Sequence, residues 1–257
     1  MRDENLHSFI PLAEAMRSLG LVYGARGITA LRKGAGGETD VAGAIESYLW
    51  CIRLLVRSYY PAFAQQQIHR SLLLRRLPLS LCLLCHYIAG GDDARQNELW
   101  ALLQKPLFDN DSRVDSWWYE RQFEPFFISL YGKARGHQLP LEPGRLELGV
   151  YGPILDQWED DRAVATSLQA ACDYHLKVMN NTRDRDAEFD MQPFDLVPVE
   201  ILATIKLRAV TGLQPITVNH PLMQTFGPIA TASPPDELQE IFGQVREKYD
   251  AFFGRTI

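Results

Sequence analysis

The sequence predicts an all-α fold, a single multi-helix domain of about eight to ten helices joined by short connections. The first observation is the composition of the chain, which holds 34 Leu and 23 Ala against 14 Ile and 12 Val. This bias favours helix over strand. The second is periodicity, since apolar residues recur at helical spacing in several long segments. The third is the weakness of strand signals, which are confined to a loose alternation over 146–151 and the short run 216–218.

Two segments show the helical pattern most clearly. Apolar residues between 41 and 59 form one stripe, which Asp40 can cap at its start and Pro61 ends. Near the C-terminus, Ser233 is a natural N-cap with Pro234 in the first helical position. The stripe from 238 to 252 then closes at Gly254.

The remaining helices follow the same rules of capping and breaking. They are expected at 6–19, ending at Gly20; at 79–89, ending at Gly90 and Gly91; from Asp92 or Asp93 to 104, ending near Pro106; over 164–179, with Leu168, Ala171, Cys172, Leu176 and Met179 on one face; and at 198–211, ending at Gly212. We interpret residues 1–257 as one helical domain, with a weak subdivision near 135–145 as the alternative.

Composition and charge exclude several classes of protein. With 46% hydrophobic residues, the 257-residue chain can bury a sizeable core and is not a disordered protein. Its net charge of -6 argues against a dedicated nucleic-acid binder, which usually has a basic face. The N-terminus MRDENLHSFI does not resemble a signal peptide, and the apolar run 77–89 is too short to span a membrane. We therefore expect a cytoplasmic protein with no membrane partner and with reduced cysteines.

Cofactor and metal motifs are weak in this sequence. Cys82, Cys85 and His86 match the c-type haem attachment string, but haem attachment needs export, and a zinc site would need two further ligands. Buried core cysteines are the preferred interpretation. The glycine segments 20–27 and 34–37 lack the preceding strand of a dinucleotide fingerprint, so we expect helix ends and a loop, and no cofactor.

Acidic residues are concentrated in the second half of the chain. Residues 1–135 hold 16 basic and 14 acidic residues, a net of +2, whereas 136–257 hold 10 and 18, a net of -8. Two interpretations stay open: solvated loops at helix ends, or a surface that docks a basic partner. The candidate partner-binding acids are Asp156, Glu159, Asp160, Asp161, Asp184, Asp186, Glu188 and Asp190.

Aromatic residues offer candidate anchors for the same partner. Trp117 and Trp118 are adjacent, so both are buried on a helix only where elements meet. They either belong to the core or, with Tyr151, anchor a partner, because aromatic residues dominate interface energetics.

One enzymatic alternative uses the same acids. Asp156, Glu159 and Asp160, followed by Asn180, Asp184 and Glu188 at helical spacing, are comparable to the carboxylates with which helical isoprenoid synthases hold magnesium and diphosphate. The first motif departs from the aspartate-rich D-D-x-x-D pattern, and the second lacks a hydroxyl residue at its middle position.

A resemblance appears in the C-terminal third of the chain. The segment PVEILATIKLRAVTGLQPITVNHPLM (198–223), with the preceding DYHLK (173–177), resembles the C-terminal part of helical immunity proteins encoded beside bacterial polymorphic or type VI-secreted toxins. The resemblance implies an all-helical cytoplasmic protein without catalysis or cofactor, which binds one cognate toxin and blocks its active site. It carries no site residue over to a position of this sequence.

These observations leave three functional hypotheses. The first is an immunity protein whose acidic surface occludes the basic cleft of a toxin. The second is a helical scaffold or regulator that binds another protein. The third is the magnesium-dependent isoprenoid-type enzyme.

Overall fold

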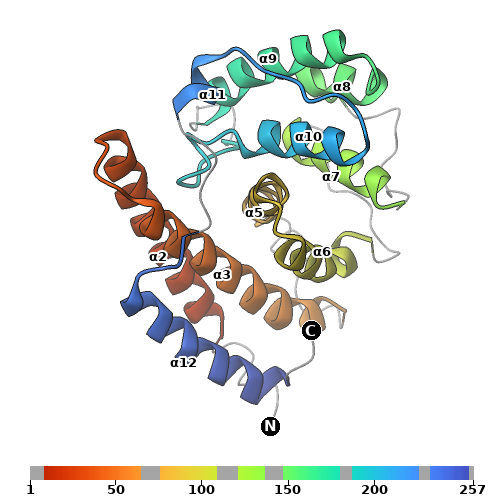
Figure 1. Cartoon of the computed structure of the whole chain (residues 1–257). Helices are drawn as coiled ribbons and strands as arrows, with labels where there is room; N and C mark the ends of the chain where they lie inside the picture. Colours follow the sequence, from red (N-terminus) through yellow and green to blue (C-terminus); the bar gives the residue numbers. More distant parts are fainter. Residues whose placement is uncertain are drawn as a thin grey trace. The chain divides into compact units, whose positions relative to one another are not determined.

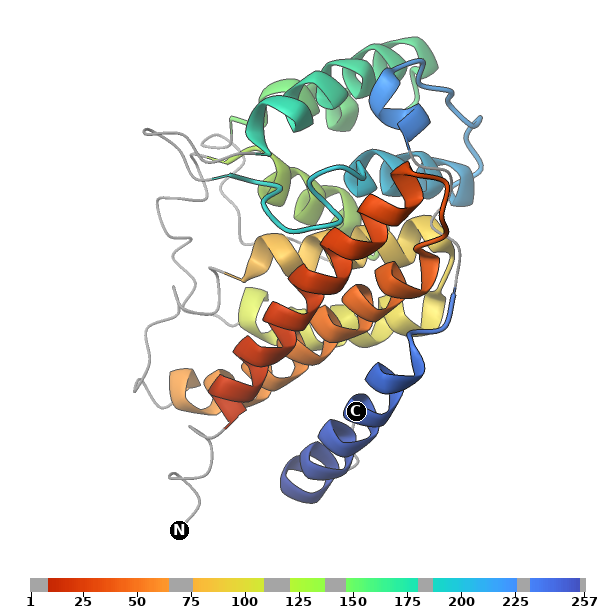
Figure 2. The same cartoon turned by 90° about the vertical axis from the view of Figure 1, so that its left-hand side faces the viewer.

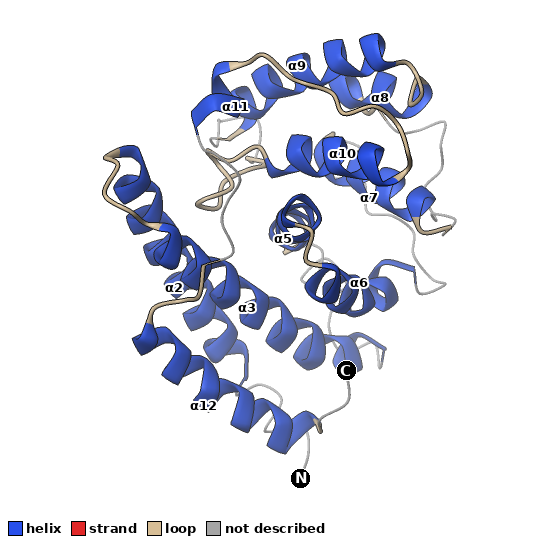
Figure 3. Cartoon of the chain, viewed as in Figure 1, coloured by secondary structure: helices blue, strands red, loops and turns tan. Residues whose placement is uncertain are grey.

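The computed structural model describes residues 9–64, 76–108, 121–136, 147–179, 187–225 and 232–254. In these ranges the chain is helical with connecting turns and loops, and no residue is in a strand (Figure 3). The prediction of an all-α fold is confirmed. None of the described helices combines the length and the hydropathy that a membrane-spanning helix requires.

The chain forms two compact units, which we describe separately. Unit 1 comprises Met1–Arg76, Asn97–Pro106 and Ile229–Ile257, and unit 2 comprises Leu77–Gln96 and Leu107–Pro228. The alternative boundary near 135–145 falls mostly outside the described residues, and neither unit begins or ends there.

Unit 1 is built on a pair of long helices. Helix α2 (Phe9–Arg32) packs along α3 (Glu38–Ala64), and the C-terminal helix α12 (Asp236–Phe253) packs on α3 (Figures 1 and 2). The turn between α2 and α3 uses Gly34 and Gly36 at φ of 64° and 76°, a conformation that favours glycine. The loop expected at 34–37 is therefore confirmed.

The expected helix end at Gly20 is wrong, because α2 continues through this residue to Arg32. A Cβ at Gly20 would lie 2.3 Å from Cε1 of Tyr48, and one at Gly27 would lie 2.7 Å from Cγ2 of Val41. The glycines thus allow α2 and α3 to approach closely. Their cost to helix propensity is offset by the packing of the Tyr48 ring, which is fully buried.

Two prolines were also expected to mark helix ends. Instead α3 runs past Pro61 to Ala64, and α6 (Asp93–Phe108) runs past Pro106. Each proline lies in the last turns of its helix, where the lost backbone hydrogen bond disturbs few residues downstream. The start of α6 agrees with expectation, because Asp92 Oδ1 accepts a hydrogen bond from the Arg95 amide at 3.0 Å.

The N-terminus of α12 begins later than the sequence predicted. Its N-cap is Pro235, at φ -55° and ψ 148°, rather than Ser233. A residue that precedes proline is disfavoured in the helical region, so Pro234 before Pro235 cannot open the helix. Gly254 ends the helix at φ 78°, as predicted.

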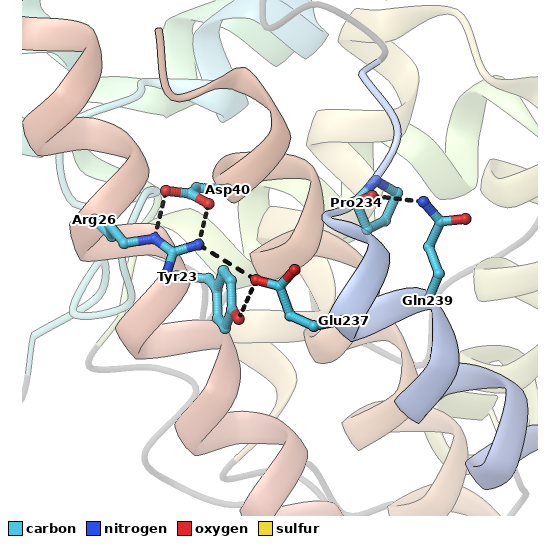
Figure 4. Close-up of polar contacts among 6 residues, drawn as sticks. All are labelled: Tyr23, Arg26, Asp40, Pro234, Glu237 and Gln239. Atoms are coloured by element: carbon cyan, nitrogen blue, oxygen red, sulfur yellow. Dashed lines mark hydrogen bonds and ion pairs between the residues drawn. The ribbon is translucent and has the colours of Figure 1, made fainter. Parts of the chain in front are cut away.

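Polar contacts join the start of α12 to the helix pair in unit 1 (Figure 4). The Tyr23 hydroxyl donates to Glu237 Oε1 at 3.2 Å, and Arg26 Nε donates to Asp40 Oδ2 at 2.6 Å. Gln239 Nε2 donates to the Pro234 carbonyl at 2.8 Å, which satisfies a carbonyl just before the helix. Arg26 also lies 4.0 Å from Glu237 Oε1, so Glu237 joins the start of α12 to α2, while the Arg26–Asp40 pair joins α2 to α3.

Unit 2 is arranged around α10 (Val199–Val210). This helix packs against α5 (Leu77–Gly90), α7 (Phe123–Ala134) and α9 (Asp161–Val178). The short elements η3 (Gly149–Tyr151) and α8 (Gly152–Asp156) precede α9, and α11 (Pro221–Thr225) follows α10 (Figure 1). The first weak strand signal, at 146–151, corresponds to a 3₁₀ turn at 149–151 in the part of the segment that the structure describes. The second, at 216–218, is a loop and not a strand.

The four cysteines are free and buried, as expected for core residues. Burial raises the pKa of the Cys51 and Cys172 thiols to about 12. Burial also raises the pKa of Cys82 and Cys85, so all four thiols stay protonated at neutral pH.

We predict that Gly20→Ala destabilises the protein by about 1–3 kcal/mol, because the new methyl group overlaps the Tyr48 ring. Gly243→Ala is the matched control, since this α12 glycine is exposed and has open space around its Cβ position. The control should gain about 0.5–1 kcal/mol from helix propensity. Urea denaturation measures both, and equal stability of the two variants would contradict the close packing of α2 on Tyr48.

Candidate functional site

Four exposed carboxylates gather where α8 meets α9. We call residues 156–161 the acidic turn; its acids are Asp156, Glu159, Asp160 and Asp161. Asp160 is the N-cap of α9, and its Oδ1 accepts hydrogen bonds from the Arg162 and Ala163 amides, both at 3.0 Å. The cap fixes the direction of the backbone at the start of α9.

A buried arginine of α10 forms hydrogen bonds with the acidic turn. Arg208, in the last turn of α10, is fully buried. One of its terminal nitrogens donates to the Trp158 carbonyl and the other to Asp161 Oδ1. Its guanidinium carbon also lies 5.2 Å from the centroid of the Trp158 ring. The arginine thereby ties the backbone and one acid of the turn to α10.

Arg208 belongs to a buried polar stripe on α10. Glu200, Thr204 and Arg208 occupy positions i, i+4 and i+8, and each is fully buried. The Thr204 hydroxyl donates to the Glu200 carbonyl at 2.7 Å. Sequence reasoning missed these residues, although their spacing places them on one helix face with Leu207, and that spacing was the available signal.

Glu200, the N-terminal residue of the polar stripe, contacts a histidine of α9. His175 Nδ1 lies 2.9 Å from Glu200 Oε1, and Nε2 lies 3.2 Å from the Asp195 carbonyl, which can only accept. The ring stacks on Phe189 at 4.1 Å between centroids. Burial lowers the pKa of His175, but Glu200 and the Asp195 carbonyl outweigh it, so the pKa is raised.

The buried face of α9 differs from the predicted apolar face at this contact. His175 and Val178 are buried, whereas Leu176, which we expected on the stripe, is 43% exposed. The polar contact with Glu200 keeps His175 on the buried face of α9. The predicted positions Val164, Leu168, Ala171 and Cys172 are buried.

Glu188 was predicted as a surface acid, and this is wrong because it is only 1% exposed. Its carboxylate accepts hydrogen bonds from the Phe123 amide at 3.0 Å and the Gln122 amide at 3.4 Å, at the start of α7. The Tyr174 hydroxyl donates to it at 2.5 Å. Negative charge at a helix N-terminus is stabilising, so Glu188 supports the fold.

A second buried carboxyl group lies in the first turn of α7. Glu124 Oε1 accepts from Arg121 Nε at 2.6 Å, while Oε2 has no hydrogen-bond partner among the described residues. Burial, with a smaller contribution from the nearby Glu188, raises the pKa of Glu124 to about 8 against the opposing effect of Arg121. Near neutral pH this group is therefore largely protonated.

The other predicted partner residues divide into three groups. Asp190 is exposed, in the loop between α9 and α10. Tyr151 is fully buried and stacks on Phe126 at 4.6 Å between centroids, so it is not an exposed anchor. Asp184, Asp186, Trp117 and Trp118 lie outside the described residues.

Of the carboxylates named in the isoprenoid hypothesis, the structure describes four, and only Glu188 among these is buried. Asp156, Glu159 and Asp160 are exposed at the acidic turn, and Glu188 accepts from α7. Asn180 and Asp184 lie outside the described residues. In the ranges that the structure covers, no three His, Cys, Asp or Glu side chains are placed to hold a metal ion.

Comparisons with known proteins found no matching family model, no matching curated protein and no matching solved structure. Function is therefore inferred from the surface chemistry of the chain. The buried polar groups described above form hydrogen bonds with one another or with backbone groups, and these bonds connect the helices of unit 2. The acidic turn is the predicted site residue set that the structure brings together on the surface.

We predict that the protein loses stability as pH rises from about 5 to 8, a window set by the Glu124 pKa. The folded pKa of Glu124, about 8, exceeds the ordinary value of 4.5, so the folded state binds more protons than the unfolded state within this window. The contribution of this proton to the free energy of unfolding is complete below the window and is lost as the pH rises through it. The raised pKa of His175 acts in the same direction.

Glu124→Gln should reduce this loss, because glutamine keeps the acceptor for Arg121 and cannot ionise. Urea denaturation at pH 5 and pH 9 measures the effect, with the exposed Glu247→Gln as control. An unchanged pH dependence in Glu124→Gln would show that Glu124 is not the titrating group.

We predict that Arg208→Met loosens the acidic turn and destabilises the protein by about 1–3 kcal/mol, because the Trp158 carbonyl loses its donor. Amide hydrogen exchange at 157–162 should become faster. Lys206→Met, an exposed change on the same helix, should leave exchange there unaltered. If both variants behave alike, Arg208 does not hold the turn.

Proposed function

We propose that this chain is a non-catalytic binding protein of the immunity-protein class. In this proposal the acidic turn docks on the positively charged cleft of a cognate toxin and occludes its active site. The observation that carries the proposal is the acidic turn itself, in which four carboxylates are exposed on a backbone that Asp160 caps and Arg208 binds.

The surrounding surface adds to the negative charge. Over residues 147–179 there are six acids and two bases, Arg162 and Lys177, a net of -4, and all six acids are exposed. A localised charge of one sign accelerates encounter with a partner of the opposite sign and disfavours other partners. The second half of the chain thus has the electrostatics that fast capture of a basic protein requires.

Preorganisation favours tight binding by such a surface. The turn is capped at Asp160 and tied to α10 by Arg208, so its backbone loses little freedom when a partner binds. Exposed ion pairs contribute little each, so a tight complex also needs an aromatic anchor. Trp158 is partly exposed within the acidic turn and takes the place of the buried Tyr151 as the candidate anchor.

The experiment begins with capture of a partner by the tagged full-length chain from its native cells, at low and high salt. A captured protein that arrests growth when expressed alone, and whose effect is removed by co-expression of this chain, is the toxin of the proposal. A folded, abundant chain that captures nothing would contradict it.

Association kinetics with the purified partner then test the surface. Asp156→Asn with Glu159→Gln removes two exposed charges from the acidic turn and leaves the cap and Arg208 untouched. The association rate at low salt should fall by about 3- to 10-fold, with a weaker salt dependence. Glu240→Gln with Glu247→Gln removes two exposed charges from α12 and is the matched control. Equal effects of the two pairs would exclude the acidic turn as the docking surface.

A further inference from the structure

A short segment after α9 connects the end of that helix to the start of α7. The Glu188 amide donates to the carbonyl of Val178, the last residue of α9, at 3.0 Å. The Glu188 carboxyl group accepts from the amide of Phe123, the first residue of α7, at 3.0 Å. The Ala187 carbonyl accepts from a terminal nitrogen of Arg121 at 3.1 Å. We call these three contacts the clasp, because together they hold residues 187 and 188 between the two helices.

Glu124, which Arg121 also contacts, differs from Glu188 in its hydrogen bonds. Glu188 accepts from two backbone amides at the start of α7 and from the Tyr174 hydroxyl. Glu124 is fully buried and accepts from Arg121 at Oε1, whereas its Oε2 has no hydrogen-bond partner among the described residues. A buried carboxylate oxygen without a donor is costly, and protonation removes much of that cost. The contacts therefore assign the negative charge to Glu188 and a proton to Glu124.

The charged side chains that act directly on Glu124 are Arg121 and Glu188. Neighbouring elements place six further titratable groups around them: Cys82 of α5, Tyr151 of η3, Tyr174 and His175 of α9, Asp190 of the loop and Glu200 of α10. Burial raises the pKa of the Cys82 and Tyr151 side chains, so both are neutral. His175 is bonded to Glu200, and Asp190 is exposed. A negative charge on Glu124 would thus lie near that of Glu188, with Arg121 as the basic side chain in contact with it.

We propose that Glu124 is a pH-dependent trigger for the clasp, and that loss of its proton releases residues 187–191 from the start of α7. The second carboxylate repels Glu188, and its Oε2 competes with the Ala187 carbonyl for Arg121. Both effects weaken contacts of the clasp, while the backbone hydrogen bonds inside α7 are unaffected. The inference does not depend on the proposed function.

Release of this segment would expose Phe189. This side chain is 1% exposed, and its ring centroid lies 4.8 Å from that of Phe123 and 4.1 Å from that of His175. When the clasp opens, the segment loses its hydrogen bonds to both helices, so the ring becomes accessible to solvent and to proteases. The clasp is therefore kept closed by apolar packing and opened by charge.

Proton binding sets the direction of the pH dependence. Burial raises the pKa of Glu124 to about 8 in the closed clasp, against an ordinary value of 4.5. Opening therefore releases a proton throughout this interval, and the closed form is favoured below it. The equilibrium constant for opening should rise by up to about tenfold per pH unit within the interval and level off above it.

Native-state hydrogen exchange of the full chain at pH 5 and pH 8 measures this opening. Protection factors are compared, because they divide out the intrinsic base catalysis of exchange. Those of the Phe123 and Glu188 amides should fall by at least about tenfold, whereas those of the amides that Asp160 caps should change little. If the clasp amides share the protection and the urea dependence of residues 127–131 inside α7, the clasp opens only on unfolding and the inference is wrong.

Glu124→Gln separates the trigger from other titrating groups. Glutamine keeps an acceptor for Arg121 and cannot ionise, so protection of the two clasp amides should become nearly independent of pH in this interval. Glu247→Gln, an exposed change on α12, is the matched control and should keep the fall in protection. An undiminished fall in Glu124→Gln would overturn the inference.

Chymotrypsin, which cleaves after exposed aromatic residues, tests the release of Phe189 separately. Comparing the unaltered chain with Glu124→Gln at one pH removes the pH dependence of the protease itself. At pH 8, cleavage after Phe189, identified by mass spectrometry, should be several-fold faster in the unaltered chain, and at pH 5 the two chains should be cleaved alike. Equal rates at pH 8 would contradict release of the segment.

Discussion

The arrangement of unit 2 depends on one buried charge, the guanidinium of Arg208. Burying a cation is costly, and the fold offsets this cost because the Trp158 carbonyl and Asp161 accept hydrogen bonds from its two terminal nitrogens. Arginine suits this position because its planar fork reaches two acceptors at once and stays charged when desolvated. The consequence is an acidic turn whose geometry is set from inside the unit, while its carboxylates face solvent.

The same helix that carries Arg208 also sets the rotation of α9. Glu200 pairs with His175, and this contact places His175 inside and Leu176 outside. With that rotation Asp173 and Lys177 lie on the exposed face of α9. The polar stripe of α10 therefore decides which residues of α9 a partner meets. This links the buried chemistry of unit 2 to the surface that we propose for binding.

Much of the secondary structure could be predicted from the sequence, because caps and apolar stripes act locally. Asp92 before α6 and Gly254 after α12 are examples in which a single residue type fixes a helix end. Gly20 shows the limit of such reasoning. Its meaning depends on Tyr48, which lies in another helix, and no local rule reveals that contact. Pro234 does not open α12 as predicted, because the following Pro235 disfavours the helical conformation at position 234.

The residues of the candidate site likewise fall into those whose position could be predicted from the sequence and those whose position could not. Exposed acids at 156–161 could be predicted, since charge in a turn between helices is normally solvated. Glu188 and Tyr151 could not, because their burial depends on α7 and Phe126, which are distant in sequence. The polar stripe of α10 was visible as a spacing of four, but its partners His175 and Trp158 became evident only in three dimensions.

The central claim is that α10 and the acidic turn form one structural unit through Arg208. Native-state amide hydrogen exchange at increasing, subdenaturing urea tests it most directly, because segments that open together share one free energy and one urea dependence. We expect the amides of Asp160–Val164 and of Thr204–Arg208 to converge on the same opening reaction. Exchange of the acidic turn through a separate opening of much lower free energy and little urea dependence would contradict the account.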